Sequence, residues 1–180
     1  MVDTQHTTSY YAASANPAPA RPALQGSSET DVCVIGAGFT GISAALHLAE
    51  QGFRVTVLEA VQVGFGASGR NGGQIVNSYS RDIDVIERTL GADQARLLGD
   101  MAFEGGRIIR ERVARYNIDC DLKDGGVFAA LNDKHMKHLE AQKKLWERYG
   151  NTQLELLDER RIREVVNTDI YTGGMLDMSG

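Results

Sequence analysis

The chain has 180 residues, with 19 Lys and Arg against 24 Asp and Glu, and its formal net charge is -5. Apolar residues make up 42% and charged residues 24%, which is ordinary for a globular domain and excludes a chain that is disordered throughout. The acidic balance argues against a nucleic-acid-binding module, which would carry a basic surface. Glycine is the exception, because its 20 residues are about 11% of the chain against an average of about 7%.

The two cysteines indicate the compartment. Cys33 and Cys120 are far apart, so they predict neither a disulfide framework nor a metal site, and a reduced, cytoplasmic protein is the simplest interpretation. The N-terminus lacks the basic residues and apolar run of a secretory signal. No stretch reaches the roughly 18 apolar residues of a membrane span. We therefore expect no metal, no membrane span and no nucleic-acid partner.

The first 29 residues are predicted to be a flexible segment. All three prolines, Pro17, Pro19 and Pro22, lie here among small and polar residues, a composition that does not favour a packed core. Tyr10 and Tyr11 are the one feature that could dock on another part of the protein. We favour the alternative, in which this pair is exposed and mobile.

A strand–helix–strand unit follows. Residues 31–35 are apolar and rich in β-branched side chains, which predicts a buried parallel strand. Apolar residues at helical spacing predict a helix over 39–51. Residues 54–58 form a second strand that ends at Glu59. Together they predict a βαβ unit.

Further elements are predicted from periodicity and turn residues. Residues 61–80 read as a long ordered loop. The elements expected after it are helices over 82–90 and 93–117, a hairpin over 119–131 with its turn at 124–126, a helix over 133–149, a strand over 154–157, a helix over 159–166 and a strand over 173–178. We expect a kink or a close helix crossing at Gly105 and Gly106, Trp146 in the core, and Asp158 as a helix cap.

A glycine motif lies between the first strand and the first helix. Its residues are Gly36, Ala37, Gly38, Phe39, Thr40 and Gly41. In the G-x-G-x-x-G pattern the first glycine makes the turn, the second lets the backbone approach a pyrophosphate, and the third allows close helix–strand packing. The phosphates would sit at the helix N-terminus, where N–H groups and the helix dipole favour negative charge.

An acidic residue completes the dinucleotide pattern. Glu59 stands at the end of the second strand, where its carboxylate would accept hydrogen bonds from an adenosine ribose. The same charge would repel a 2′-phosphate, so NADP is disfavoured. The motif by itself does not separate NAD from FAD.

A second glycine-rich segment, residues 64–74, favours the longer cofactor. Its backbone N–H groups could bind a second phosphate, and Arg70 could neutralise the charge of that phosphate. Asn71 and Gln74 could form hydrogen bonds with the polar edges of the cofactor. An ordinary NAD dehydrogenase would have no use for this segment. The cofactor-binding residues predicted beyond the first motif are Glu59, Ala60, Gly66, Ala67, Ser68, Arg70, Asn71, Gly72, Gly73 and Gln74.

These two segments resemble those of the FAD-dependent amine and amino-acid oxidases of the D-amino-acid oxidase or glycine oxidase type. Residues 8–16, 64–74, 76–86 and 146–151 are similar to members of that family that act on γ-glutamylputrescine. The resemblance implies an α/β protein: a Rossmann-like FAD-binding βαβ domain of the glutathione-reductase type, then the start of a mixed-sheet substrate domain.

Members of this family are longer, so we expect the chain to be a truncated, N-terminal part of such an enzyme, inactive by itself and lacking its C-terminal half. The domains expected are a flexible segment over 1–29, the first part of the FAD-binding domain over 30–118, and an incomplete substrate-binding domain over 119–180.

The resemblance also implies an activity. The enzyme would oxidise the primary amine of γ-glutamylputrescine to the aldehyde, releasing ammonia, and O₂ would accept the electrons as H₂O₂. None of the four histidines lies in residues 64–74, so FAD is expected to be bound non-covalently. No catalytic residue is assigned. Asn77 and Tyr79 are candidates for the substrate side.

Three alternatives remain open at this point. One is a related FAD-dependent oxidase for another amine or amino acid, of the glycine or sarcosine type. Another is an inactive dinucleotide-binding fragment that serves as a binding module. An NAD dehydrogenase is the most distant of the three.

Overall fold

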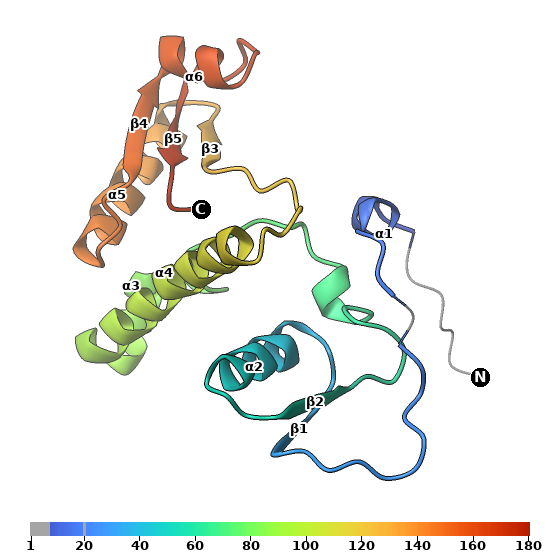
Figure 1. Cartoon of the computed structure of the whole chain (residues 1–180). Coiled ribbons are helices and arrows are strands. Elements are labelled where there is room, and N and C mark those ends of the chain that lie inside the picture. Colours follow the sequence, from blue (N-terminus) through green and yellow to red (C-terminus); the bar gives the residue numbers. More distant parts are fainter. Residues whose placement is uncertain (1–7, 20) are drawn as a thin grey trace. The chain divides into compact units, whose positions relative to one another are not determined.

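The computed structural model describes residues 8–19 and 21–180 (Figure 1), so predictions for residues 1–7 and 20 lie outside the described part. The chain divides into two compact units, Met1–Gly73 and Gln74–Gly180. No helix among the described residues is long and apolar enough to cross a membrane. In the same residues, no group of three His, Cys, Asp or Glu side chains is placed to hold a metal ion.

The first unit contains the predicted βαβ arrangement. It consists of strand β1 (Val32–Ile35), helix α2 (Phe39–Glu50) and strand β2 (Val55–Leu58). The strands pair in parallel with Val32 opposite Val55, and α2 packs against both of them (Figure 1). The predicted order of strand, helix and parallel strand is therefore confirmed.

Burial of β1 differs from the prediction. Ile35 is 88% exposed and Cys33 is exposed as well, whereas Val34 faces α2 near Gly41. The physical reason is that, among residues 8–19 and 21–73, the sheet of this unit has two strands, and α2 packs on the face that carries Val34. The expectation of a buried strand was therefore wrong for the face that carries Cys33 and Ile35.

The described part of residues 1–29 contains a short helix, α1 (Tyr10–Ser14). The Ser9 side chain caps it by accepting a hydrogen bond from the Ala12 N–H. Its neighbours over 15–19 and 21–29 are exposed and form no helix or strand. The segment predicted as flexible throughout thus has one ordered turn.

The second unit combines helices with a three-stranded sheet. Its elements are α3 (Ile83–Leu90), α4 (Ala92–Arg115), β3 (Gly126–Ala130), α5 (Asp133–Arg148), β4 (Leu154–Asp158), α6 (Glu159–Val165) and β5 (Gly173–Asp177). The strand order is β3-β5-β4, and both pairings are antiparallel. The sequence predicts a mixed sheet here, whereas the sheet is antiparallel within the described residues.

The hairpin predicted over 119–131 is wrong, because β3 pairs with β5 instead. Gly125 has a φ of 89° and donates its N–H to the Gly180 carbonyl at 2.8 Å. A Cβ at Gly125 would lie 2.9 Å from the Met178 sulfur. The glycines at this point thus allow the chain that follows β5 to approach closely, rather than forming a hairpin turn.

Helix α4 runs through Gly105 and Gly106 without interruption. A Cβ at Gly106 would lie 3.2 Å from Asn77 Oδ1 and 3.3 Å from Ile75 Cγ2, whereas Gly105 faces open space. The prediction of a kink or a helix crossing here is therefore wrong, because α4 is continuous and the close approach at Gly106 is made by the loop that carries Ile75 and Asn77.

The core of the second unit lies between its helices and its sheet. The buried residues that form it are Ile83, Ala95, Ala130, Leu139, Trp146, Tyr149, Leu154 and Met175. Trp146 meets Phe103 edge to face with ring centroids 6.1 Å apart, which confirms its predicted core position. Asp158 caps α6 by accepting from the Arg161 N–H at 2.8 Å, as predicted.

The two compact units meet between Gly73 and Gln74, whereas the sequence predicts a domain boundary after residue 118. Helix α3 packs on α4 and also contacts α5, which groups these helices with the second unit. The functional boundary at residue 118 stays a prediction.

Leu157 and Leu131 provide a matched test of this core. Leu157 is fully buried and Leu131 is 53% exposed. Leu157→Ala should lower the free energy of unfolding by about 2–5 kcal/mol, because it leaves a cavity, and Leu131→Ala by less than about 1 kcal/mol. Urea denaturation of the full-length protein, followed by circular dichroism, measures both. Equal losses in the two variants would contradict the placement of the core.

Candidate functional site

The turn between β1 and α2 has the geometry that its glycine motif predicts. Gly36 has a φ of 99°, in the region that favours glycine, and its N–H donates to the Leu58 carbonyl at 2.7 Å. A Cβ at Gly41 would overlap the Gly36 carbonyl oxygen and would lie 3.3 Å from Val34 Cγ1. The helix therefore packs on the strand as closely as the motif requires.

The N-terminus of α2 points its backbone donors toward the second glycine segment. Gly38 is the residue before the helix, and Phe39, Thr40 and Gly41 form its first turn. The Phe39 N–H donates to Ser68 Oγ at 2.9 Å. A side-chain oxygen thus stands where an anionic oxygen is favoured by the helix dipole and by N–H groups that lack a helical acceptor.

Glu59 lies against the same turn. Its carboxylate accepts hydrogen bonds from the Ala37 N–H at 2.7 Å and the Val61 N–H at 3.1 Å. These bonds, chiefly the one from Ala37, hold the pKa of the exposed Glu59 carboxyl below its ordinary value. Glu59 is therefore an ionised acceptor at the glycine turn, the position from which a ribose hydroxyl can be bound.

Two hydrogen bonds bring the two glycine-rich segments together. The Gly64 N–H donates to the Ala37 carbonyl at 3.0 Å, and Ser68 bonds Phe39 as described. Gly66 precedes a single 3₁₀ turn, Ala67–Gly69, which presents Ser68. All the predicted cofactor-binding residues except Gln74 belong to the first unit: Gly36, Ala37, Gly38, Phe39, Thr40, Gly41, Glu59, Ala60, Gly66, Ala67, Ser68, Arg70, Asn71, Gly72 and Gly73.

Arg70 and Asn71 bond within their own loop. Arg70 Nε donates to the Phe65 carbonyl at 3.3 Å, and its guanidinium lies 5.4 Å from the centre of the Phe65 ring. Asn71 donates to the Ser68 carbonyl and accepts from the Gly73 N–H, both at 2.7 Å. Gln74 is exposed and begins the second unit. Contacts of these side chains with a cofactor stay predictions.

The two candidates for the substrate side have partners inside the second unit. Asn77 is buried and donates to Ser179 Oγ at 2.6 Å. Tyr79 donates its hydroxyl to the Leu98 carbonyl at 2.7 Å. These bonds give both residues a structural role, and their contact with substrate stays a prediction.

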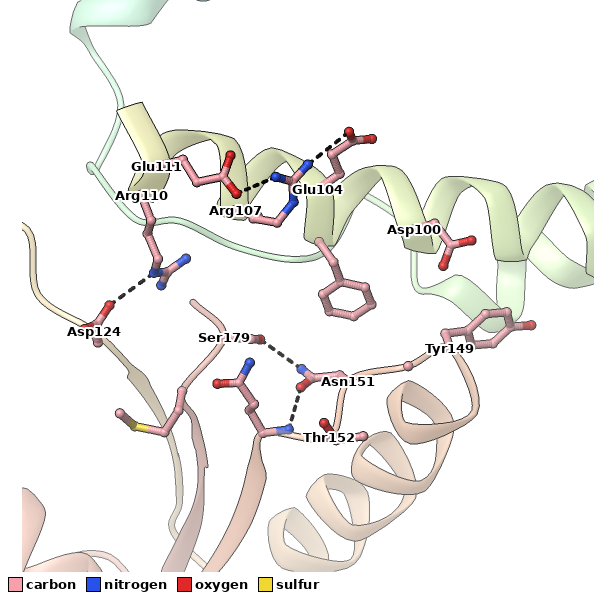
Figure 2. Close-up of a pocket in the computed structure, with 14 residues that line it drawn as sticks. Asp100, Glu104, Arg107, Arg110, Glu111, Asp124, Tyr149, Asn151, Thr152 and Ser179 are labelled. Atoms are coloured by element: carbon pink, nitrogen blue, oxygen red, sulfur yellow. Dashed lines mark hydrogen bonds and ion pairs between the residues drawn. The ribbon is translucent and has the colours of Figure 1, made fainter. Parts of the chain in front are cut away.

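The second unit has a hollow of about 930 Å³ between α4, the α5–β4 turn and the end of β5 (Figure 2). Arg107 forms ion pairs with Glu104 and Glu111, and Arg110 pairs with Asp124. Both guanidinium groups that line the hollow are thus engaged by carboxylates. The remaining lining residues are Asp100, Phe103, Tyr149, Gly150, Asn151, Thr152, Gln153, Met178 and Ser179.

A buried polar network crosses the floor of this hollow. Asn151 donates to Ser179 Oγ at 3.1 Å and to Asp177 Oδ1 at 3.3 Å, and the Ser179 N–H donates to Asp177 Oδ1 at 2.9 Å. This network is not predictable from the sequence, since no local pattern pairs Asn151 with Ser179. Because its members bond one another, the network fixes the chain that follows β5.

Comparison with known proteins agrees with the geometry of the first unit. The family described as FAD dependent oxidoreductase (DAO) matches residues 31–180. The gamma-glutamylputrescine oxidoreductase of Escherichia coli (strain K12) is 64% identical over 98% of this chain and 42% of its own length. The probable oxidoreductase OrdL of Haemophilus influenzae is 44% identical over 96% of this chain and 40% of its own length.

Solved structures share this fold. The L-amino acid deaminase from Proteus myxofaciens, in complex with anthranilate, matches with a TM-score of 0.66 and 23% identity, over 88% of this chain and 34% of its own. Because it covers 42% and 40% of the two curated relatives described above, the chain spans about two fifths of their length.

The packing of α2 predicts that position 41 tolerates only glycine. Gly41→Ala would force the helix away from the Gly36 carbonyl, so the full-length variant should lose most of its bound flavin absorbance and melt at a lower temperature. Gly105→Ala is the control, because a Cβ there meets open space and alanine favours a helix by about 1 kcal/mol. Flavin content equal in both variants would contradict this packing.

The lowered pKa of Glu59 predicts a pH dependence. A carboxyl with a depressed pKa in the folded state stabilises that state above its unfolded pKa of about 4.3 and loses this contribution as the pH falls through the folded pKa. In flavin-free protein, Glu59→Gln should therefore flatten the fall of the melting temperature between about pH 5 and pH 3.

Differential scanning fluorimetry across this range measures the slope. Glu140→Gln, at an exposed carboxylate on α5, serves as the control and should keep the wild-type slope. If Glu59→Gln also keeps that slope, its carboxylate does not hold the Ala37 and Val61 N–H groups in solution.

Proposed function

The chain belongs to the family of FAD-dependent oxidoreductases, and from this premise we propose that it forms part of an enzyme that oxidises the primary amine of γ-glutamylputrescine. One observation carries the proposal: the relative named gamma-glutamylputrescine oxidoreductase is 64% identical over 98% of this chain. Since the chain spans 42% of that relative, the activity belongs to the full-length protein.

The first unit would hold the cofactor in a Rossmann-like arrangement of the glutathione-reductase type. The backbone at Gly38 and the first turn of α2 would bind the pyrophosphate of FAD, and Glu59 would accept hydrogen bonds from the hydroxyls of the adenosine ribose. Both assignments are supported by the Ala37–Glu59 and Phe39–Ser68 bonds, which gather acceptor oxygens at this turn. Residues 64–74 would line the flavin end, and FAD would be bound without a covalent link.

When bound, FAD would supply the two-electron oxidation of the primary amine to an imine, which water would hydrolyse to the aldehyde and ammonia, with O₂ as the final electron acceptor giving H₂O₂. The contribution of this chain is to bind and orient. Gly36 and Gly41 set the approach of α2 to the strand end, and the ionised Glu59 disfavours a 2′-phosphate. The free cysteines Cys33 and Cys120 support the proposal of a cytoplasmic, reducing location.

An anaerobic visible spectrum tests this function. The full-length protein should show a flavin band that bleaches when γ-glutamylputrescine is added and stays unchanged with glycine or sarcosine, because only the first amine would reduce the bound cofactor. Readmission of O₂ should restore the band and release H₂O₂.

The other outcomes separate the alternatives. Bleaching by glycine or sarcosine instead would contradict the proposed substrate and would support a related amine or amino-acid oxidase. If the gently purified protein shows no flavin band, the proposed enzymatic function is contradicted and a dinucleotide-binding fragment is supported.

A further inference from the structure

The short helix α1 is formed by local hydrogen bonds. Ser9 accepts from the Ala12 N–H through its side chain at 3.2 Å and from the Ala13 N–H through its carbonyl at 3.0 Å. Ser14 Oγ donates to the Tyr10 carbonyl at 2.9 Å. None of the residues of α1 is buried, so the place of this helix depends on a specific contact and not on a core.

Tyr11 makes that contact. Its hydroxyl donates to the Gly72 carbonyl at 2.6 Å, across 61 residues of sequence. Tyr11 is 46% exposed, whereas its neighbour Tyr10 is 73% exposed and meets Tyr11 edge to face. Only the second tyrosine of the pair therefore reaches the loop through its hydroxyl in the structure.

The peptide group between Gly72 and Gly73 is held on both sides. Its carbonyl accepts from the Tyr11 hydroxyl, and its N–H donates to Asn71 Oδ1 at 2.7 Å. A peptide group is planar, so two bonds on opposite edges fix its orientation. Asn71 also donates to the Ser68 carbonyl, which ties this peptide to the turn that meets α2.

Gly73 leaves room for the tyrosine ring. Its φ is 74°, in the region that favours glycine, and a Cβ there would lie 2.9 Å from Tyr11 Cζ. The ring therefore lies directly against the backbone of the second glycine-rich segment. The first unit thus uses a residue from its N-terminal helix to shape a loop that follows β2.

We propose that Tyr11 is a positioning residue for the flavin-binding segment 64–74. By holding the Gly72 carbonyl, it orients the Gly72–Gly73 peptide and, through Asn71, supports the turn that carries Ser68. The inference rests on the proposed function, because that function assigns this segment to the flavin. Tyr11 acts on the cofactor through the loop and is not a catalytic residue.

The test compares two tyrosine hydroxyls in the full-length protein. Tyr11→Phe removes the bond to Gly72 and keeps the ring, while Tyr10→Phe is the matched control one residue away. Tyr11→Phe should raise the Kd for FAD about five-fold, the size expected for one hydrogen bond, and Tyr10→Phe should leave it unchanged. Quenching of FAD fluorescence on binding to flavin-free protein measures both values.

Two further readouts separate positioning from a general loss of stability. Hydrogen exchange in flavin-free protein should be faster over residues 68–74 in Tyr11→Phe and unchanged in Tyr10→Phe. At saturating FAD, the visible spectrum and the reduction potential of the bound flavin should shift in Tyr11→Phe alone.

Combining Tyr11→Phe with Asn71→Ala should weaken FAD binding by less than the product of the two single effects, because both residues hold one peptide group.

The outcomes keep this inference apart from the proposed function. If wild-type protein binds FAD and the two phenylalanine variants match it in Kd, exchange and spectrum, the role of Tyr11 is overturned and the proposed function stands. If FAD binding weakens in Tyr11→Phe while exchange over 68–74 is unchanged, positioning through this loop is overturned. If wild-type protein binds no FAD, the proposed function fails and the inference fails with it.

Discussion

Helix α2 approaches the end of strand β1 so closely that the backbone of Gly36 occupies the space a side chain at Gly41 would need. This approach places the helix N-terminus at the end of the strand. The acceptors at the turn depend on it, because Glu59 bonds the Ala37 N–H and Ser68 bonds the Phe39 N–H. A shift of the helix by the width of a methyl group would lengthen the Phe39–Ser68 bond, which is one of the two hydrogen bonds that join this turn to the second glycine-rich segment.

The two units use polar groups in different ways. In the first unit, backbone N–H groups at one turn are offered to oxygen acceptors, an arrangement suited to phosphate and ribose. In the second unit, carboxylates pair with Arg107 and Arg110, and the side-chain amides of Asn77 and Asn151 both donate to Ser179 Oγ. In the proposed function, the first pattern would exchange its oxygen partners for those of FAD. The second pattern satisfies itself and holds the fold.

The sequence predicts what is encoded locally. The βαβ unit follows from its apolar spacing and its glycines, and the Asp158 cap follows from one residue and its position. Local signals also mislead: residues 124–126 read as a hairpin turn, but β3 pairs with β5, about fifty residues later. The prediction that β1 is buried was wrong at Ile35 for a similar reason, since the burial of a strand depends on what covers the second face of its sheet.

Contacts between distant residues had no such signal. Asn77 meets Ser179 across 102 residues, and Tyr11 meets Gly72 across 61. The sequence identifies each of these side chains as available for bonding but does not name its partner. The conformation of the glycine turn was therefore predictable, while the link from the N-terminal helix to residues 72 and 73 became visible only in the structure.

The bond between Tyr11 and Gly72 persists because one chain carries both partners. A neutral hydrogen bond contributes about 1 kcal/mol, whereas a complex of even millimolar affinity needs about 4 kcal/mol. The tether removes the entropic cost of bringing two separate molecules together, so the bond does not have to offset that cost. A single protease cut in the exposed residues between α1 and β1 would turn this contact into one between two molecules. The released helix would diffuse away, although no residue of the contact itself had changed.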